Sequence, residues 1–274
     1  MKCEKKQNLP AEQYHAQKEY LSKSTLTRFK KAPILALHEQ KQTPAMAFGD
    51  MFHQFILEPQ RFFENFLLSD SPSRSSKKYK DLKLENSTKT VLIETETKKL
   101  WDMKKSLDSS QKFKDYLSKK EGTEISYFGE VFGQPAKCRF DLLTKDGIGV
   151  DLKKCQDASP EGVRKSIMNY DYHWQAVFYD LVYESVENKP LKGFVFVFVE
   201  EQAPHLVSFY GLKRFDHFGD ESFLFEHTKN QIEVLIDKYK DCVNQKNWGG
   251  YSPKVQSIEL PEWYLEKEKS EVSQ

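Results

Sequence analysis

Cysteine is scarce in this sequence, and long apolar runs are missing. The four cysteines stand at positions 3, 138, 155 and 242, so no two have the CxxC spacing of a zinc or redox site. We therefore expect free thiols in a reducing compartment and a cytoplasmic location. The longest apolar run, GFVFVFV at 193–199, is too short to span a bilayer, and the first ten residues lack the apolar core of a signal peptide. No membrane partner is expected.

Neither positively nor negatively charged residues are in excess. Lys and Arg together number 42 and Asp and Glu 41, so the formal net charge is +1 for 274 residues. Global charge therefore neither requires nor excludes a nucleic-acid partner, and any basic surface must be local. The composition is 38% hydrophobic and 14% aromatic, which is too apolar for a disordered chain.

No internal repeat and no Gly/Ser or Pro linker divides the chain, and we expect one domain over residues 21–265. Residues 1–20 are polar and predict a flexible N-terminal segment, and residues 266–274 predict a polar tail. Residues 69–89 are rich in lysine and predict a basic loop or arm. This segment is either a plain charged surface loop or a phosphate-binding one, in which case Lys77, Lys78 and Lys80 are candidate contacts.

The period of the hydrophobic pattern changes along the chain. Helical spacing is expected in the segments 22–40 (interrupted at Pro33), 44–59, 90–120, 159–185 and 217–246. Strands are expected within 122–154, where three are separated by turns, and at 192–200 and 204–212. Asp146-Gly147 between two apolar runs predicts a hairpin turn. The order of elements predicts an α/β fold, with a central mixed β-sheet flanked by helices.

Two acids and a lysine stand at the ends of two predicted strands that one short turn joins. Adjacent strands lie about 5 Å apart, so Asp141 and Asp151 could face one cation. Alternation puts Asp151 and Lys153 on one face and leaves the backbone carbonyl of Leu152 available. Two carboxylates, a carbonyl and water suit Mg²⁺ or Mn²⁺, and an adjacent lysine can orient water or stabilise charge on a phosphate. For an isolated Asp-x-Lys triplet, however, a structural salt bridge at a strand end is the favoured explanation, so further features are needed to indicate a metal site.

Two helical pairs add to this pattern. Gly49 and His53 lie four residues apart, on one side of a predicted helix, although a lone histidine there is commonly a packed or capping residue. Gln175 and Tyr179 have the same spacing on the helix that follows the Asp-x-Lys strand. The amide of Gln175 stands among apolar residues and needs a hydrogen-bond partner if it is buried.

Taken in order, G-xxx-H, D, D-x-K and Q-xxx-Y resemble the PD-(D/E)xK nuclease superfamily, and specifically its exodeoxyribonuclease VIII (RecE) branch, which is related to lambda exonuclease and RecB-type nuclease domains. The matching segments are TPAMAFGDMFHQFILEPQRF, CRFDLLTKDGIGVDLKKCQDA, YDYHWQAVFYDLVY and IELPEW, so the resemblance runs from about Tyr20 to Trp263. It implies a restriction-endonuclease-like core and a metal-dependent exonuclease that degrades linear duplex DNA in the 5′→3′ direction.

The resemblance also implies roles for individual residues. Mg²⁺, or Mn²⁺ in its place, would be bound by Asp141, Asp151, the carbonyl of Leu152 and His53, while Lys153 would hold the attacking water. Support for the site or the DNA would come from Gln175, Tyr179, Glu124 and Arg139, although a strand-edge acid such as Glu124 is commonly just solvated.

Two departures from the family pattern remove no ligand. Phe140 replaces the usual proline of Arg-Pro-Asp, and Lys154 replaces the usual threonine after Asp-x-Lys. Some superfamily members hold an iron–sulfur cluster with three cysteines bunched near the C-terminus. That bunching is missing here, so no cluster is expected.

By the same resemblance, the expected partners are double-stranded DNA ends and a single-strand annealing (RecT-like) protein, in phage or prophage recombination. The expected assembly is a homo-oligomeric ring. Two alternatives stay open: a structure-specific or nicking endonuclease on the same fold, and a non-catalytic DNA-binding scaffold.

Overall fold

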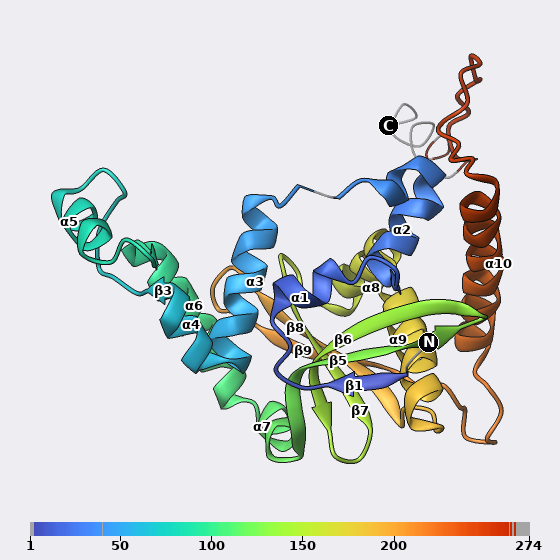
Figure 1. The fold of residues 1–274 in the computed structure, drawn as a ribbon. Helices are drawn as coiled ribbons and strands as arrows, with labels where there is room; N and C mark the ends of the chain where they lie inside the picture. The colour runs from blue at the N-terminus through green and yellow to red at the C-terminus, as the bar shows by residue number, and fades with distance from the viewer. Residues whose placement is uncertain (1–2, 40, 263, 265, 267–274) are drawn as a thin grey trace.

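A seven-stranded mixed sheet forms the centre of the protein (Figure 1). The computed structural model describes residues 3–39, 41–262, 264 and 266. The strand order is β1-β5-β6-β7-β8-β9, with β2 beside β6. The β7–β8 and β2–β6 pairs are parallel and the other pairs antiparallel. The bounds are β1 (Glu4–Lys6), β2 (Leu21–Ser22), β5 (Lys120–Val131), β6 (Gln134–Thr144), β7 (Ile148–Cys155), β8 (Gly193–Glu200) and β9 (Val207–Leu212).

Helices cover both faces of the sheet, which confirms the predicted fold class. On one face lie α2 (Lys23–Lys31), α8 (Pro160–Tyr170), α9 (Tyr172–Glu187) and α10 (Phe223–Gln245). The other face carries α3 (Pro44–Leu57), α4 (Pro59–Asn65), α6 (Glu94–Ser109) and α7 (Gln111–Ser118). Each face buries its own apolar cluster, and Val150 and Leu152 of β7 belong to the α3–α6 side. Among the described residues, no helix is long and apolar enough to cross a membrane.

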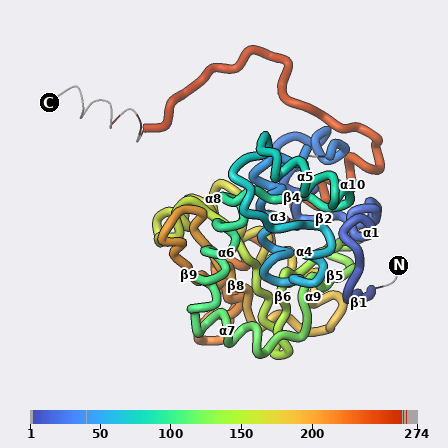
Figure 2. Tube along the Cα trace, turned by 90° about the vertical axis from the view of Figure 1, so that its left-hand side faces the viewer, coloured from blue at the N-terminus to red at the C-terminus, as the bar shows by residue number. Residues whose placement is uncertain are grey.

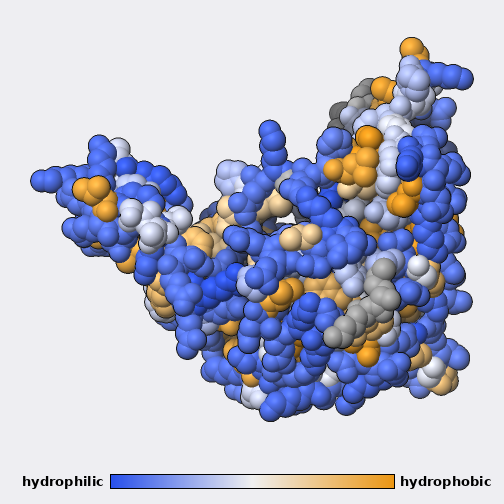
Figure 3. Space-filling view, in the orientation of Figure 1, coloured by the Kyte–Doolittle hydropathy of each residue, from blue (hydrophilic) through white to orange (hydrophobic). Residues whose placement is uncertain are grey.

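The lysine-rich segment forms a lobe that projects from the sheet on the left of Figure 1 and faces the viewer in Figure 2. It contains β3 (Phe66–Leu67), α5 (Lys77–Glu85) and β4 (Thr90–Val91). The expected loop is therefore partly a helix. Ser76 provides the reason, because its hydroxyl accepts the N–H of Tyr79 and caps the first turn. Figure 3 shows the surface of this lobe to be mainly hydrophilic.

Residues 3–20, the described part of the N-terminal segment that the sequence predicts to be flexible, pack onto the sheet. β1 pairs with β5, and α1 (Ala11–Ala16) buries Tyr14. The ammonium of Lys137, a residue of β6 that is only 5% exposed, donates to the carbonyls of Tyr14 at 2.7 Å and Gln17 at 2.6 Å. A buried ammonium needs such acceptors, so this lysine fixes the segment on the sheet.

Other expected elements have shifted boundaries. The predicted helix 159–185 is two helices, because Asp171 between them has a left-handed backbone with φ 52°. The segment 90–120 is also broken, at Ser110, into α6 and α7. The three strands and the hairpin at Asp146-Gly147 are confirmed, with Gly147 at φ 82°.

Candidate active site

Strands β6 and β7 separate at Asp141. Their pairing covers Leu142–Val150 and Leu143–Gly149. Immediately beyond it, Asp141 Oδ2 accepts the backbone N–H of Leu152 at 2.8 Å, so a side chain takes the place of a strand carbonyl. The N–H and C=O of one residue in an extended strand point toward the same neighbour. The carbonyl of Leu152 is therefore also directed to the side of Asp141.

Glu124 stands opposite Asp141 at an irregular point of β5. The register pairs Thr123 with Leu142 and Ile125 with Phe140, but the residue between them has a left-handed backbone with φ 50°. A positive φ is uncommon for a residue other than glycine, and such a local irregularity redirects the side chain. Glu124 is thereby brought to Asp141.

Helix α3 supplies the third member of this group. Thr43 caps its N-terminus, and His53 lies in its third turn, with Nδ1 3.4 Å from Asp141 Oδ2. One ligand atom from each of His53, Glu124 and Asp141 lies within 4.8 Å of the other two. Burial raises the pKa of Glu124, and the charge of Asp141 raises it further. Burial also raises the pKa of Asp141, against the opposing effect of His53. A cation would relieve this electrostatic cost.

Asp151 lies beside this group and is 3% exposed. Its Oδ1 accepts a hydrogen bond from the amide of Gln175, which is the partner that the buried amide requires. Its Oδ2 lies 2.6 Å from the ammonium of Lys153 and otherwise has no hydrogen-bond partner among the described residues. The sequence predicts Asp141 and Asp151 as the acidic pair, whereas the compact group contains Glu124 in place of Asp151.

The residues present fit a divalent cation. Carboxylate oxygens with one imidazole suit Mg²⁺ or Mn²⁺, and Asp151 Oδ2 is a buried oxygen with free acceptor capacity. His53, Glu124 and Asp141 would hold the ion, with Asp151 and the carbonyl of Leu152 as the nearest further oxygens on β7.

Lys153 is held as a cation. Burial alone lowers the pKa of its ammonium, but the carboxylates of Asp151 and Asp141 outweigh burial and raise the pKa. Its Nζ also lies 4.8 Å from the ring centre of Tyr172. The next residue, Lys154, lies on the opposite face, where it pairs with Glu201 at 2.6 Å and lies against Gly49 of α3.

The other predicted support residues have structural contacts. Tyr179 packs edge-on against Phe140, with ring centres 5.4 Å apart. Arg139 donates to the hydroxyl of Ser126 at 2.9 Å and to the carbonyl of Leu9, and its guanidinium lies 3.6 Å from Glu124. Arg139 therefore joins Glu124 to the N-terminal segment. Lys77, Lys78 and Lys80 lie on α5 of the projecting lobe, where Lys78 pairs with Asp70.

Lys23 is a residue near the site that sequence reasoning missed. It begins α2, and its ammonium donates to the carbonyl of Tyr170 at 2.7 Å. Burial and the charge of Lys153 lower the pKa of Lys23 to about 8. No spacing in the sequence signals this neighbour, because about 130 residues separate the two lysines along the chain.

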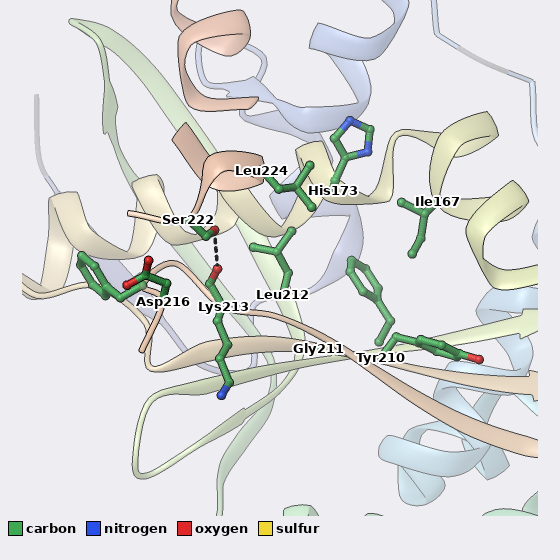
Figure 4. Close-up of a pocket in the computed structure, with 11 residues that line it drawn as sticks. Ile167, His173, Tyr210, Gly211, Leu212, Lys213, Asp216, Ser222 and Leu224 are labelled. Atoms are coloured by element: carbon green, nitrogen blue, oxygen red, sulfur yellow. Dashed lines mark hydrogen bonds between the residues drawn. The ribbon is translucent and has the colours of Figure 1, made fainter. Parts of the chain in front are cut away.

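A separate cavity of about 590 Å³ lies between α8, α9, β9 and the start of α10 (Figure 4). Its lining is mostly apolar and includes Ile167, Phe196, Leu212 and Leu224, together with His173. None of the acidic residues described above lines it. The candidate site is therefore defined by the charged residues at the separation of β6 and β7.

A mixed sheet whose central strands part at two acids and a lysine defines a PD-(D/E)xK-type core. Residues 22–261 match the family described as a PDDEXK-like domain of unknown function, and the chain belongs to this family. The predicted superfamily is thus confirmed, while the RecE branch stays a prediction. No curated protein matches the chain.

The fold is also found among solved structures. A crystal structure of a candidate exonuclease from Eubacterium rectale aligns with a TM-score of 0.64 and 14% identity, over 95% of this chain and 98% of that chain. At this identity, the likeness shows the shared fold alone. A second crystal structure, of the protein SSO0001, aligns with a TM-score of 0.32 and 13% identity, over 75% of this chain and 88% of that chain, and carries no argument.

Proposed function

We propose that the protein is a divalent-metal-dependent nuclease that degrades linear double-stranded DNA from its ends, in the 5′→3′ direction, as the RecE-like resemblance implies. The observation that carries the nuclease chemistry is the meeting of His53, Glu124 and Asp141 with the Asp151–Lys153 pair, where β6 and β7 separate. The 5′→3′ direction of degradation and the preference for DNA ends rest on the RecE-like resemblance.

The chain's own residues have distinct tasks in this proposal. A bound divalent cation supplies positive charge that polarises water and the phosphodiester. His53, Glu124 and Asp141 hold it, and their two carboxyl groups must lose their protons for this, so the raised pKa values make binding stronger at higher pH. Lys153 remains charged and donates to the attacking water or to a phosphate oxygen. Gln175 and Lys153 together fix the carboxylate of Asp151.

The proposed partners extend beyond the site. Lys77, Lys78 and Lys80 would bind DNA phosphates from the projecting lobe. A single-strand annealing (RecT-like) protein would take the exposed strand, and a homo-oligomeric ring would retain the duplex. These partners rest on the resemblance.

The test compares one plasmid as a closed circle and as a linear duplex labelled at its 5′ or 3′ end. With Mg²⁺, we expect the wild type to degrade the linear form only and to release the 5′ label first. Excess chelator and Asp151→Asn should each abolish degradation. Cutting of the circle would overturn the exonuclease assignment. Undiminished digestion in the presence of chelator would overturn the proposed dependence on a metal ion.

Metal binding has its own readout. Mn²⁺ should raise the melting temperature of the wild type, because a ligand that binds the folded state stabilises it. Asp141→Asn should lose this increase, whereas Asp50→Asn, which removes an acid of α3 that contacts Gln42, should keep it.

A further inference from the structure

Two tyrosines flank the break between α8 and α9. Tyr170 ends α8 and Tyr172 begins α9, with Asp171 between them in a left-handed conformation. The two rings are stacked, with centres 5.5 Å apart and planes 29° apart. Tyr172 is half-buried, but Tyr170 is 60% exposed. The left-handed residue between the two helices therefore leaves the ring of Tyr170 in solvent, stacked on the ring of Tyr172.

This stack leads from solvent to the catalytic lysine. The ring of Tyr172 lies 4.8 Å from Lys153 Nζ and is itself stacked on Phe196, with centres 5.6 Å apart. Phe196 pairs in register with Asp151 on the neighbouring strand. Tyr170 is thus the exposed end of an aromatic column whose next ring contacts Lys153.

Two lysines hold the break in place. Lys23 donates to the carbonyl of Tyr170 at 2.7 Å, and Lys30 pairs with Asp171 at 2.9 Å. They fix the position of Tyr170, and Lys23 adds positive charge beside it, whereas the charge of Lys30 is paired with that of Asp171. Exposed aromatic rings within a basic surface are the means by which proteins bind single-stranded nucleic acid, because every base has a face that can stack.

We propose that Tyr170 stacks on an unpaired base of the strand being cut, next to the phosphate that Lys153 contacts. An isolated exposed tyrosine is ordinary. Tyr170 differs because the ring on which it is stacked, that of Tyr172, contacts the ammonium of Lys153. This inference rests on the proposed function and adds that the end of the duplex must open before hydrolysis.

The first test measures stacking without hydrolysis. In metal-free buffer, Tyr170→Trp should show fluorescence quenching by a single-stranded oligonucleotide, beyond the quenching that the wild type shows. The control Tyr251→Trp replaces a tyrosine that is 75% exposed and lies beyond the end of α10, outside the α8–α9 break, and it should show no added quenching. Equal quenching in the two variants would overturn the inference.

The second test is a cycle of protein and DNA changes. An abasic position next to the scissile bond should slow the wild type about tenfold, within the range for loss of one stacked base. Tyr170→Ala should be equally slow on intact DNA and should lose nothing further on abasic DNA, while Tyr170→Phe keeps the wild-type response. If the abasic position slowed hydrolysis by the wild type and by Tyr170→Ala to the same extent, the stacking of a base on Tyr170 would be overturned. Absence of hydrolysis in the wild type would instead refute the proposed function and leave the fluorescence test to decide the inference.

Discussion

Glu124 and Asp141 face each other across β5 and β6, and Glu124 holds a left-handed backbone there with φ 50°. Such a conformation costs roughly 1–2 kcal/mol for a residue with a side chain. Burial of the two carboxyl groups, whose pKa values are both raised, adds to this cost. Backbone strain and buried charge therefore coincide at the group proposed to bind metal, as is common at functional sites.

Substitution of Glu124 should separate stability from activity. Glu124→Gly removes the carboxylate and relieves the left-handed backbone, whereas Glu124→Ala removes only the carboxylate. We expect both variants to lose nuclease activity, with Glu124→Gly more stable than Glu124→Ala by roughly 1 kcal/mol. Denaturant unfolding in metal-free buffer measures the difference. An alanine variant as stable as the glycine variant would show that the backbone is not strained.

Lys153 and Lys154 form a matched pair, because consecutive residues of β7 point to opposite faces. Lys153→Met should lower the turnover rate by at least about a hundredfold, the usual cost of removing one charge-stabilising donor. Lys154→Met removes the ion pair with Glu201 and should keep the rate within a few-fold of the wild type. The rate of label release, measured at a saturating concentration of linear DNA, compares the two variants with the wild type. Similar losses in both variants would contradict the role given to Lys153.

The sheet was predictable because its pattern is local. Alternating residues and the Asp146-Gly147 turn define β5–β7, and the Asp-x-Lys spacing fixes which side chains share a face. The sequence identifies Glu124 as a candidate residue but does not predict its position in the group with His53 and Asp141, because nothing in its neighbours signals a left-handed backbone. The N-terminal fold depends on Lys137, whose burial arises from contacts about 120 residues apart. Asp171 interrupts a continuous helical pattern through tertiary contacts with Lys30.

The projecting lobe gives a prediction about DNA affinity. Lys77 and Lys80 are exposed on α5, so Lys77→Gln/Lys80→Gln should weaken duplex binding without changing the melting temperature. If each lysine contacts one phosphate, the slope of log affinity against log salt should fall by about 2. Fluorescence anisotropy with labelled duplex in metal-free buffer measures this slope. Lys238→Gln/Lys240→Gln on α10 is the control, and an equal change there would assign the effect to net charge alone.

Asp180 gives a prediction about stability and pH that is separate from the metal site. Burial raises the pKa of Asp180 to about 7, against the opposing effects of the Leu191 N–H, which donates to Oδ1 at 2.8 Å, and of Arg214. The ordinary pKa of an aspartate is about 3.9. Between these values, the folded state holds a proton that the unfolded state has lost, so this carboxyl makes folding less favourable as pH rises from about 4 to 7 and adds no further change above that.

Asp180→Asn keeps an acceptor for Leu191 and removes the titration. Relative to the wild type, the variant should therefore gain stability as pH rises through this window, with a slope of at most about 1.4 kcal/mol per pH unit. Urea unfolding of both proteins at pH 5, 6, 7 and 8 gives the difference. Glu184→Gln, which removes another partner of Arg214, controls for loss of that ion pair. A stability difference that stays constant with pH would mean that Asp180 is ionised throughout, and that its N–H donor and Arg214 compensate fully for burial.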